Sequence, residues 1–147
     1  MAAQVDFYIL PHSEAAEKHR YACRIANKAF GQGMTVFIAT EDAAQSAALD
    51  KLLWTFAQNS FVPHAVCDGD AKDRARYPVQ IGAGDAPHGP NAFDLLISLR
   101  RDAPHDYAQF ARVAELIIDD ANDKTAGRAR FRFYREQGIA PNTHNIS

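Results

Sequence analysis

The sequence is short of the residues that build disulfide frameworks and zinc centres. It has two cysteines, Cys23 and Cys67, and neither belongs to a Cys-x-x-Cys pair. Two thiols alone do not complete a tetrahedral zinc site, so we expect both to be reduced and at least partly buried. No apolar run approaches the roughly 20 residues of a membrane helix, and the stretch from Met1 to Asp6 lacks the layout of a signal peptide. We therefore expect a cytoplasmic protein without membrane contact.

Motifs of nucleotide binding and hydrolysis are also missing. The chain has no Gly-Lys-Ser/Thr phosphate loop, no Gly-x-Ser-x-Gly elbow and no His-Glu-x-x-His helix. Gly82-Ala-Gly84 follows an expected strand, but the next residues, Asp-Ala-Pro-His-Gly-Pro, cannot open the helix that a dinucleotide site requires. These absences predict a protein without catalytic residues and without a cofactor.

Two small clusters could in principle hold a metal ion. His64 and Cys67 have a His-x-x-Cys spacing, but residues three positions apart on a strand point to opposite faces. Asp119, Asp120 and Asp123 suit the positive N-terminal end of a helix better than a divalent cation. We therefore predict no metal site.

The composition is that of one globular domain spanning 1–147. Hydrophobic residues make up 47% and charged residues 23% of the chain, which is too apolar for a disordered protein. The formal net charge of −2 gives the whole molecule no strong attraction to nucleic acid or to an anionic membrane.

Hydrophobic periodicity predicts alternating strands and helices. Short apolar runs predict strands over Val5–Leu10, Met34–Ala39, Pro63–Cys67, Pro78–Ile81, Phe93–Leu99 and Ala114–Ile118. Helical spacing and stop signals predict helices over Glu14–Phe30, from Asp42 to about Phe56, and from about Asn122 to Gly138. This order predicts an α/β fold with a mostly parallel, twisted sheet and helices on both faces. Residues from about 139 to 147 are expected to form a flexible tail.

The last predicted helix concentrates positive charge. Between Lys124 and Arg135 lie five cationic residues and no carboxylate, so the rest of the chain is acidic. Lys124, Arg128, Arg132 and Arg135 recur at i, i+4, i+8 and i+11, which places them in one stripe. Like charges stacked in this way repel one another and do not stabilise the helix, so the pattern favours an anionic partner.

Aromatic residues accompany this stripe. We expect Phe131 and Tyr134 to lie beside it and Phe133 to face the sheet. A cleft edged by arginine and floored by a ring suits a short acidic segment with an aromatic anchor, because guanidinium groups pair with carboxylates through two parallel bonds. A solvated basic face above ordinary core aromatics fits the same pattern, and the spacing alone leaves both interpretations open.

A second candidate surface surrounds the single tryptophan. Trp54 ends a predicted helix, and Phe61 and Pro63 belong to the segment that follows it. Large apolar residues on a loop tend to form a contact patch. Plain core packing explains the same residues equally well.

Several of these segments together resemble a known family. They are Phe7-Tyr8, Leu53-Trp54, Ser60-Phe61-Val62-Pro63-His64, Pro78-Val79, Leu96-Ile97-Ser98-Leu99 and Arg128-x-Arg130-Phe131-x-x-Tyr134-Arg135-x-x-Gly138. The combination resembles the chi subunit of the bacterial DNA polymerase III holoenzyme, over essentially the whole chain. The resemblance implies a single Rossmann-like α/β domain without a nucleotide site. It also implies a non-catalytic accessory subunit that links the clamp-loader complex to single-stranded DNA-binding protein, and that meets DNA only indirectly.

The resemblance also assigns a peptide site. The ligand in this family is the acidic C-terminal tail of single-stranded DNA-binding protein, which ends in an Asp-Phe-Pro-Phe type sequence with a free carboxylate. By position, Lys124, Arg128 and Arg132 would meet the acidic groups and the terminal carboxylate. Phe131 and Ile117 would shape the pocket for the last phenylalanine of the tail.

A second partner is implied as well. Trp54, Phe61 and Pro63 match the patch that faces the psi subunit of the clamp loader, or a substitute partner. The chain departs from the family pattern at two positions. Phe131 stands where tyrosine is frequent, and Gly127 stands where a better helix former is usual, which should cost roughly 1 kcal/mol in local helix stability.

Two further functions remain as alternatives. The first is a small-molecule or nucleotide-binding enzyme of a Rossmann-like fold. The second is direct DNA binding through the basic stripe, for which four charges on an acidic domain give only a weak, salt-sensitive footing.

Overall fold

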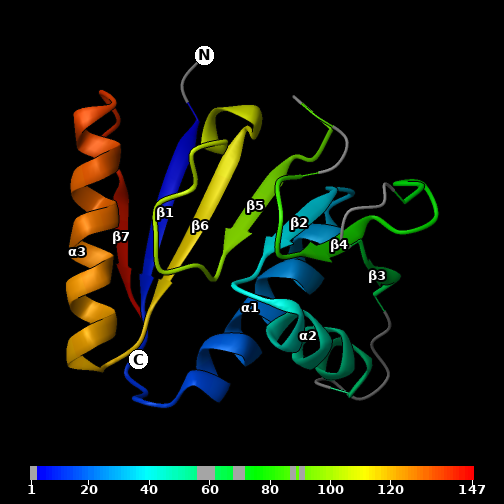
Figure 1. The fold of residues 1–147 in the computed structure, drawn as a ribbon, viewed down its shortest axis with the longest axis horizontal. Helices are drawn as coiled ribbons and strands as arrows, with labels where there is room; N and C mark the ends of the chain where they lie inside the picture. The colour runs from blue at the N-terminus through cyan, green and yellow to red at the C-terminus, as the bar shows by residue number, and fades with distance from the viewer. Residues whose placement is uncertain (1–2, 56–61, 68–71, 87–88, 90–91) are drawn as a thin grey trace.

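The computed structural model describes residues 3–55, 62–67, 72–86, 89 and 92–147. Its strands form one sheet in the order β3-β4-β2-β5-β6-β1-β7, and every described pairing is parallel (Figure 1). The strands are β1 (Gln4–Ile9), β2 (Val36–Ala39), β3 (His64–Val66), β4 (Val79–Gly82), β5 (Leu95–Ser98), β6 (Arg112–Ile117) and β7 (Asn142–Asn145). The helices are α1 (Ala15–Gly31), α2 (Ala43–Thr55) and α3 (Ala121–Glu136), with a short 3₁₀ turn, η1 (Tyr107–Gln109).

The predicted α/β architecture is confirmed. All six predicted strands and all three predicted helices are present, with ends that differ by up to two residues. Parallel strands of one sheet need a crossover connection, and α1 supplies it between β1 and β2, which β5 and β6 separate in the sheet.

Two apolar layers, one on each face of the sheet, hold the helices. Along β5, Leu95 and Ile97 pack into the layer that α1 and α2 cover, whereas Leu96 packs into the layer with Tyr134 of α3. This alternation follows from the two-residue side-chain period of a strand. Because both faces are covered, every residue of β5 is buried, as a uniformly apolar run predicts.

The C-terminal segment differs from the flexible tail predicted for about 139–147. Gly138, with a φ of 84°, turns the chain after α3, and β7 then pairs with β1 in parallel register. All four residues of β7 are exposed, so no apolar alternation marked it as a strand. The backbone ladder and side-chain bonds to Asp6 hold it instead: the Asp6 Oδ1 atom accepts from Asn142 Nδ2 at 3.2 Å and lies 3.0 Å from His144 Nε2.

Both cysteines are buried free thiols, as predicted. Burial raises the pKa of the Cys23 thiol to about 12, so this sulfur stays protonated and unreactive at neutral pH. Among the described residues, no helix is long and apolar enough to cross a membrane.

Candidate functional site

The acidic cluster before α3 fixes the start of that helix. Asp120 is the N-cap, and its Oδ2 accepts a hydrogen bond from the Asp123 backbone N–H at 3.0 Å. The Asp123 carboxylate accepts from the Ile118 N–H at 2.7 Å and from Lys18 Nζ of α1 at 2.6 Å. The predicted role of these carboxylates at a helix N-terminus is therefore confirmed.

The inner face of α3 carries a buried charged pair. The Arg130 side chain is 3% exposed and that of Glu115 on β6 is fully buried, and Arg130 Nε donates to Glu115 Oε1 at 2.9 Å. The Tyr134 hydroxyl donates to Glu115 Oε2 at 2.7 Å. Burial raises the pKa of Glu115, although Arg130 opposes that shift. One of the five cations counted in the sequence therefore serves the interior.

Two aromatic positions differ from the prediction. Tyr134, expected beside the stripe, is completely buried, because it reaches the Glu115 carboxylate beneath the helix. Phe133, expected to face the sheet, is only partly buried and packs edge-on against Tyr107 of η1 at 5.7 Å between ring centroids. The helical phase set by Arg130 and Tyr134 leaves Phe133 at the side of α3.

Gly127 of α3 packs directly on the side chain of Ile117 of β6. A Cβ atom at this position would lie 2.4 Å from Ile117 Cδ1 and 2.8 Å from Ile117 Cγ1. A glycine that looked like a weakness of the helix is therefore what lets α3 pack on this strand. Ile117 itself is 7% exposed and lies beneath Gly127, so it supports the helix from below and lines no described hollow on the outer face.

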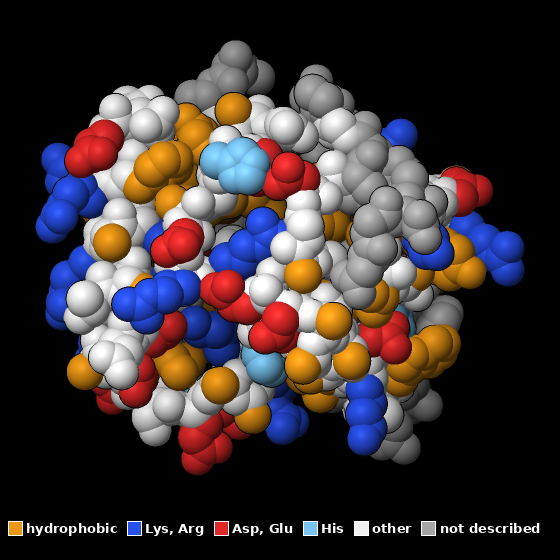
Figure 2. All heavy atoms as spheres, in the orientation of Figure 1, with side chains coloured by type: hydrophobic (Ala, Val, Ile, Leu, Met, Phe, Trp, Pro, Cys, Tyr) orange, Lys and Arg blue, Asp and Glu red, His pale blue; other side chains and the backbone are white. Residues whose placement is uncertain are grey.

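The outer face of α3 holds a shallow depression, called here the α3 depression. Its lining residues are Arg128, Phe131, Arg132, Arg135 and Glu136. The three arginines are exposed, and Figure 2 shows Lys and Arg side chains along the margin where α3 lies in Figure 1. The Phe131 ring is half-buried and held 5.2 Å from the Phe7 ring on β1. An apolar ring is thus fixed between guanidinium groups.

The five residues predicted for the tail site are only partly brought together. Arg128, Phe131 and Arg132 share the α3 depression, whereas Ile117 lies underneath the helix. Lys124 stands apart at the start of α3, where its Nζ lies 2.6 Å from Asp119 Oδ1. The site assignment missed Glu136, a carboxylate on the rim, although its i+4 spacing from Arg132 could have shown it.

The predicted second patch is partly described. Trp54 on α2 is 56% exposed, the one large hydrophobic side chain so exposed among the described residues, and its ring meets that of His64 at 4.9 Å. Pro63 is half-buried nearby in sequence, and Phe61 lies outside the described residues. The structure thus favours a surface role for Trp54 over core packing.

His64 and Cys67 occupy opposite sides of the sheet, as predicted. The His64 ring is buried, with Nδ1 2.6 Å from the Val62 carbonyl and Nε2 3.1 Å from the Asp50 carbonyl of α2. Cys67 belongs to the apolar layer beneath α3. His64 and Cys67 therefore pack in different environments and do not form one site.

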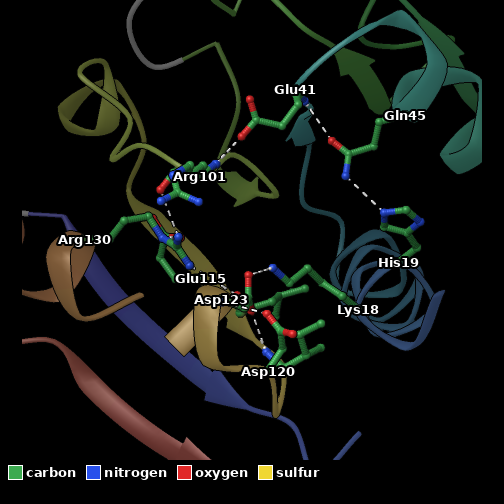
Figure 3. A network of polar contacts seen from close by, with 11 residues as sticks. Lys18, His19, Glu41, Gln45, Arg101, Glu115, Asp120, Asp123 and Arg130 are labelled. Carbon is green, nitrogen blue, oxygen red and sulfur yellow. Dashed lines mark hydrogen bonds and ion pairs between the residues drawn. The ribbon is translucent and has the colours of Figure 1, made fainter. Parts of the chain in front are cut away.

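The carboxyl ends of the strands are the usual ligand site of an open parallel sheet. Here the chain's own side chains line that crevice with a polar network and bond to one another across it (Figure 3). The ion pair of Lys18 with Asp123 joins α1 to α3, and Glu41 after β2 accepts from the Arg101 backbone N–H. Gln45 Nε2 continues the network to His19 Nε2 at 3.0 Å.

The glycine segment at the end of β4, Gly82-Ala-Gly84, also bonds to a side chain of the protein itself. The Arg100 side chain donates to the Thr40 carbonyl at 2.9 Å and to the Gly82 carbonyl at 3.3 Å. A phosphate site of this fold needs free backbone N–H groups at the start of a helix, and this segment presents carbonyl groups to an arginine.

These features define a class: a parallel α/β domain of nucleotide-binding architecture, with side chains bonded to one another at its usual ligand crevice and a cationic, aromatic face on its last helix. The profile of the family described as DNA polymerase III chi subunit, HolC, matches residues 2–142. The chain belongs to this family, which makes it an accessory subunit of DNA polymerase III and places it in DNA replication.

Relatives named DNA polymerase III subunit chi match almost end to end. The Pseudomonas aeruginosa protein is 41% identical over 97% of this chain and 96% of its own length. The Haemophilus influenzae protein is 31% identical over 99% of both chains, and the Escherichia coli protein is 30% identical over 93% of this chain and 94% of its own. The resemblance found in the sequence is confirmed.

A solved structure shares the fold at low identity. Yeast Dbp5, solved bound to Gle1 and IP6, superposes with a TM-score of 0.68 and 11% identity. The match covers 97% of this chain and 42% of the Dbp5 chain. This likeness shows the Rossmann-like architecture and nothing about ligands.

Proposed function

We propose that this chain is a non-catalytic adaptor that links the clamp-loader complex to the acidic C-terminal tail of single-stranded DNA-binding protein. The observation that carries the proposal is the α3 depression, where three arginines surround the ring of Phe131. No described ion pair involves Arg128, Arg132 or Arg135, so among the described residues their charge is uncommitted.

The tail has the complementary chemistry. Its last phenylalanine packs on the Phe131 ring, and its terminal carboxylate pairs with Arg128 or Arg132 through charge-assisted hydrogen bonds. Such a bond is worth about 1.5–3 kcal/mol where it is desolvated and under about 1 kcal/mol where it is exposed. Arg128 and Arg132 are exposed, and the ring would exclude water from only one side of the pair, so each bond should lie between these two values.

Lys124 and Phe131 have narrower roles. Lys124 already pairs with Asp119, so upstream acidic residues of the tail must compete with that carboxylate for it. Lys124 therefore adds attraction over a distance rather than a fixed contact. Phe131 has no hydroxyl, so it offers the tail an apolar surface alone.

The patch around Trp54 is the proposed contact with the psi subunit or a substitute partner. Tryptophans half exposed on a helix end are frequent anchors of protein interfaces. We assign Pro63 to the same surface because it follows Trp54 closely in the sequence. The assignment of Phe61 to this surface remains a prediction. In this proposal both the α3 depression and the patch around Trp54 bind proteins. The subunit therefore meets DNA only indirectly, and neither contact involves a cofactor.

A nucleotide-binding enzyme is the second candidate, and only the Rossmann-like fold favours it. The network at the carboxyl ends of the strands speaks against it, because Lys18 and Arg100 are already bonded to groups of the chain itself. A thermal-shift titration with ATP, GTP and NAD separates the two candidates. Stabilisation that rises with nucleotide concentration would favour the enzyme.

The direct test is fluorescence polarisation with a labelled peptide that ends in Asp-Phe-Pro-Phe and a free carboxylate. Arg128→Ala and Phe131→Ala should each weaken binding about tenfold or more, with circular dichroism melts to show that the variants fold. Arg76→Ala is the matched control, since Arg76 is an exposed cation in the turn before β4. Equal affinity for all four proteins would remove the site from α3.

A further inference from the structure

A second cationic row lies on α1. Arg20, Arg24 and Lys28 recur at i, i+4 and i+8, and all three are exposed. Because α1 packs in the opposite apolar layer from α3, this row is a surface separate from the α3 depression (Figure 1). Only Arg20 has a described acidic neighbour, Glu17, at 3.9 Å between Nε and Oε1.

A cleft runs beside this row, between α1, the middle of β1 and the starts of β5 and β6. The residues that line its sides are Tyr8, Tyr21, Ile25, Met34 and Leu95, together with the cations Lys28 and Arg112. We call it the α1 cleft. Apolar side chains and cations share its walls, as they do in the α3 depression, and Asp6 and Gln32 complete the polar part of the lining.

The charge balance of the α1 cleft is positive. Its one carboxylate, Asp6, is 4% exposed and already bonded to Gln4, Asn142 and His144. Arg112 Nη2 lies 3.6 Å from Asp6 Oδ2, too far for a hydrogen bond, and its buried Nε has no hydrogen-bond partner among the described residues. Asp6 therefore balances one of the two lining cations, Arg112, through a loose ion pair, and Lys28, which has no described ion pair, leaves the cleft one positive charge in excess.

The aromatic rings point to a peptide ligand and away from nucleic acid. Single-stranded nucleic acid stacks its bases on free ring faces. Here the Tyr8 ring stacks on His144 at 5.0 Å and 20°. The Tyr21 ring is flanked by Tyr8 at 5.7 Å and by the Arg24 guanidinium at 5.6 Å. With these faces in use, the aliphatic wall of Ile25 and Met34 is the part that can receive a ligand group.

We infer that the α1 cleft and the row Arg20, Arg24 and Lys28 bind an acidic peptide segment that carries one large apolar side chain. The apolar side chain enters between α1 and the sheet, and the neighbouring carboxylates pair with Lys28, Arg24 and Arg112. The subunit then has two peptide sites of like chemistry, one on each face of the sheet. A partner that presents several acidic segments could engage both, which raises avidity without any new contact.

The test uses the full-length chain and a labelled peptide, Asp-Asp-Asp-Leu-Asp-Phe-Pro-Phe, in fluorescence polarisation at low salt. The double variant Arg128→Glu/Arg132→Glu removes the α3 depression as a competing site. In this background we expect residual binding that Arg24→Glu/Lys28→Glu weakens at least tenfold. Arg76→Glu, a charge reversal in the turn before β4, is the matched control and should leave the residual binding unchanged.

The outcomes separate this inference from the proposed function. If the double variant on α3 binds no peptide, the α1 cleft is not a peptide site and the α3 proposal stands. If residual binding persists but Arg24→Glu/Lys28→Glu does not weaken it, the α1 cleft is not a peptide site, and the loss caused by the α3 substitutions alone decides the α3 proposal. If the α3 variant binds like wild type while the α1 variant does not, the α3 assignment fails and the α1 cleft remains. Binding of labelled oligothymidine in place of the peptide, lost with Lys28→Glu, would overturn the peptide ligand.

Discussion

Arg130 Nε on α3 and Glu115 Oε1 on β6 lie 2.9 Å apart, with almost no solvent exposure on either side chain. The same arginine donates through Nη1 to the Arg101 carbonyl at 3.0 Å, and so it ties α3 to the loop after β5 as well as to β6. This pair sets the rotation of α3 about its axis. Because Arg130 points inward, Arg128 and Arg132 on either side of it point outward into the α3 depression.

Breaking this pair should strongly destabilise the fold. Arg130→Met leaves the Glu115 carboxylate buried without its cation, and such losses cost about 3–5 kcal/mol. Urea unfolding of Arg130→Met and of the double variant Arg130→Met/Glu115→Leu measures this cost, and the double variant should recover part of the stability. A single variant as stable as wild type would show that the pair does not hold α3.

Replacing Gly127 tests the packing of α3 on β6. Gly127→Ala improves helix propensity by about 1 kcal/mol. Its methyl group nevertheless falls 2.4 Å from Ile117 Cδ1, closer than atoms can approach. We expect net destabilisation in thermal melts, of about 1–3 kcal/mol as in other overpacked cores.

A second substitution, Ile117→Val, tests whether the contact with Ile117 causes this destabilisation. Ile117→Val removes the δ-methyl group that the new Cβ would meet, so Gly127→Ala should cost less in an Ile117→Val background. Additive effects of the two substitutions would mean that the contact does not limit the approach of the helix.

Apolar runs in the sequence were enough to predict most of the strands and helices. They did not predict every residue of the candidate site. Leu95 and Ile97 marked a central strand because burial on both faces leaves an uninterrupted apolar run. The spacing of Arg128, Arg132 and Arg135 likewise placed three cations on one side of α3, which the structure shows.

The remaining features depend on partners distant in sequence. Arg130 faces inward because it bonds to Glu115, fifteen positions earlier in the sequence. The helical period of α3 alone does not show this. The β7 strand was hidden for the same reason, because its side-chain partner Asp6 lies 138 residues before His144. Gly127 looked like a local flaw until Ile117 was seen beneath it.

The attachment of β7 should depend on pH through Asp6. Burial alone would raise the pKa of Asp6, but hydrogen bonds with His144, Asn142 and Gln4 lower it overall from the ordinary value of 3.8. A carboxyl with a lowered pKa in the folded state contributes stability that is present above pH 3.8 and is lost as the pH falls through the lower folded value.

The stability difference between wild type and Asp6→Asn should therefore shrink as the pH falls from about 5 to below 3.8. Denaturant unfolding at a series of pH values measures it. Hydrogen exchange of the β7 amides should quicken in Asp6→Asn, with the amides of β5 as the internal control. A stability difference that does not change with pH would exclude Asp6 as the titrating group.

Trp54 should matter for partner binding far more than for folding. Its side chain is 56% exposed, so Trp54→Ser removes little buried apolar area and should change the free energy of unfolding by at most about 1 kcal/mol. In co-purification with the proposed partner, a psi subunit or its substitute, we expect Trp54→Ser to reduce the recovered complex at least tenfold, as loss of an aromatic anchor does. Leu53→Ala is the contrasting control, because Leu53 is fully buried beside it and its truncation should lower the melting temperature instead. If Trp54→Ser retains that partner at the wild-type level, the partner contact lies elsewhere on the surface.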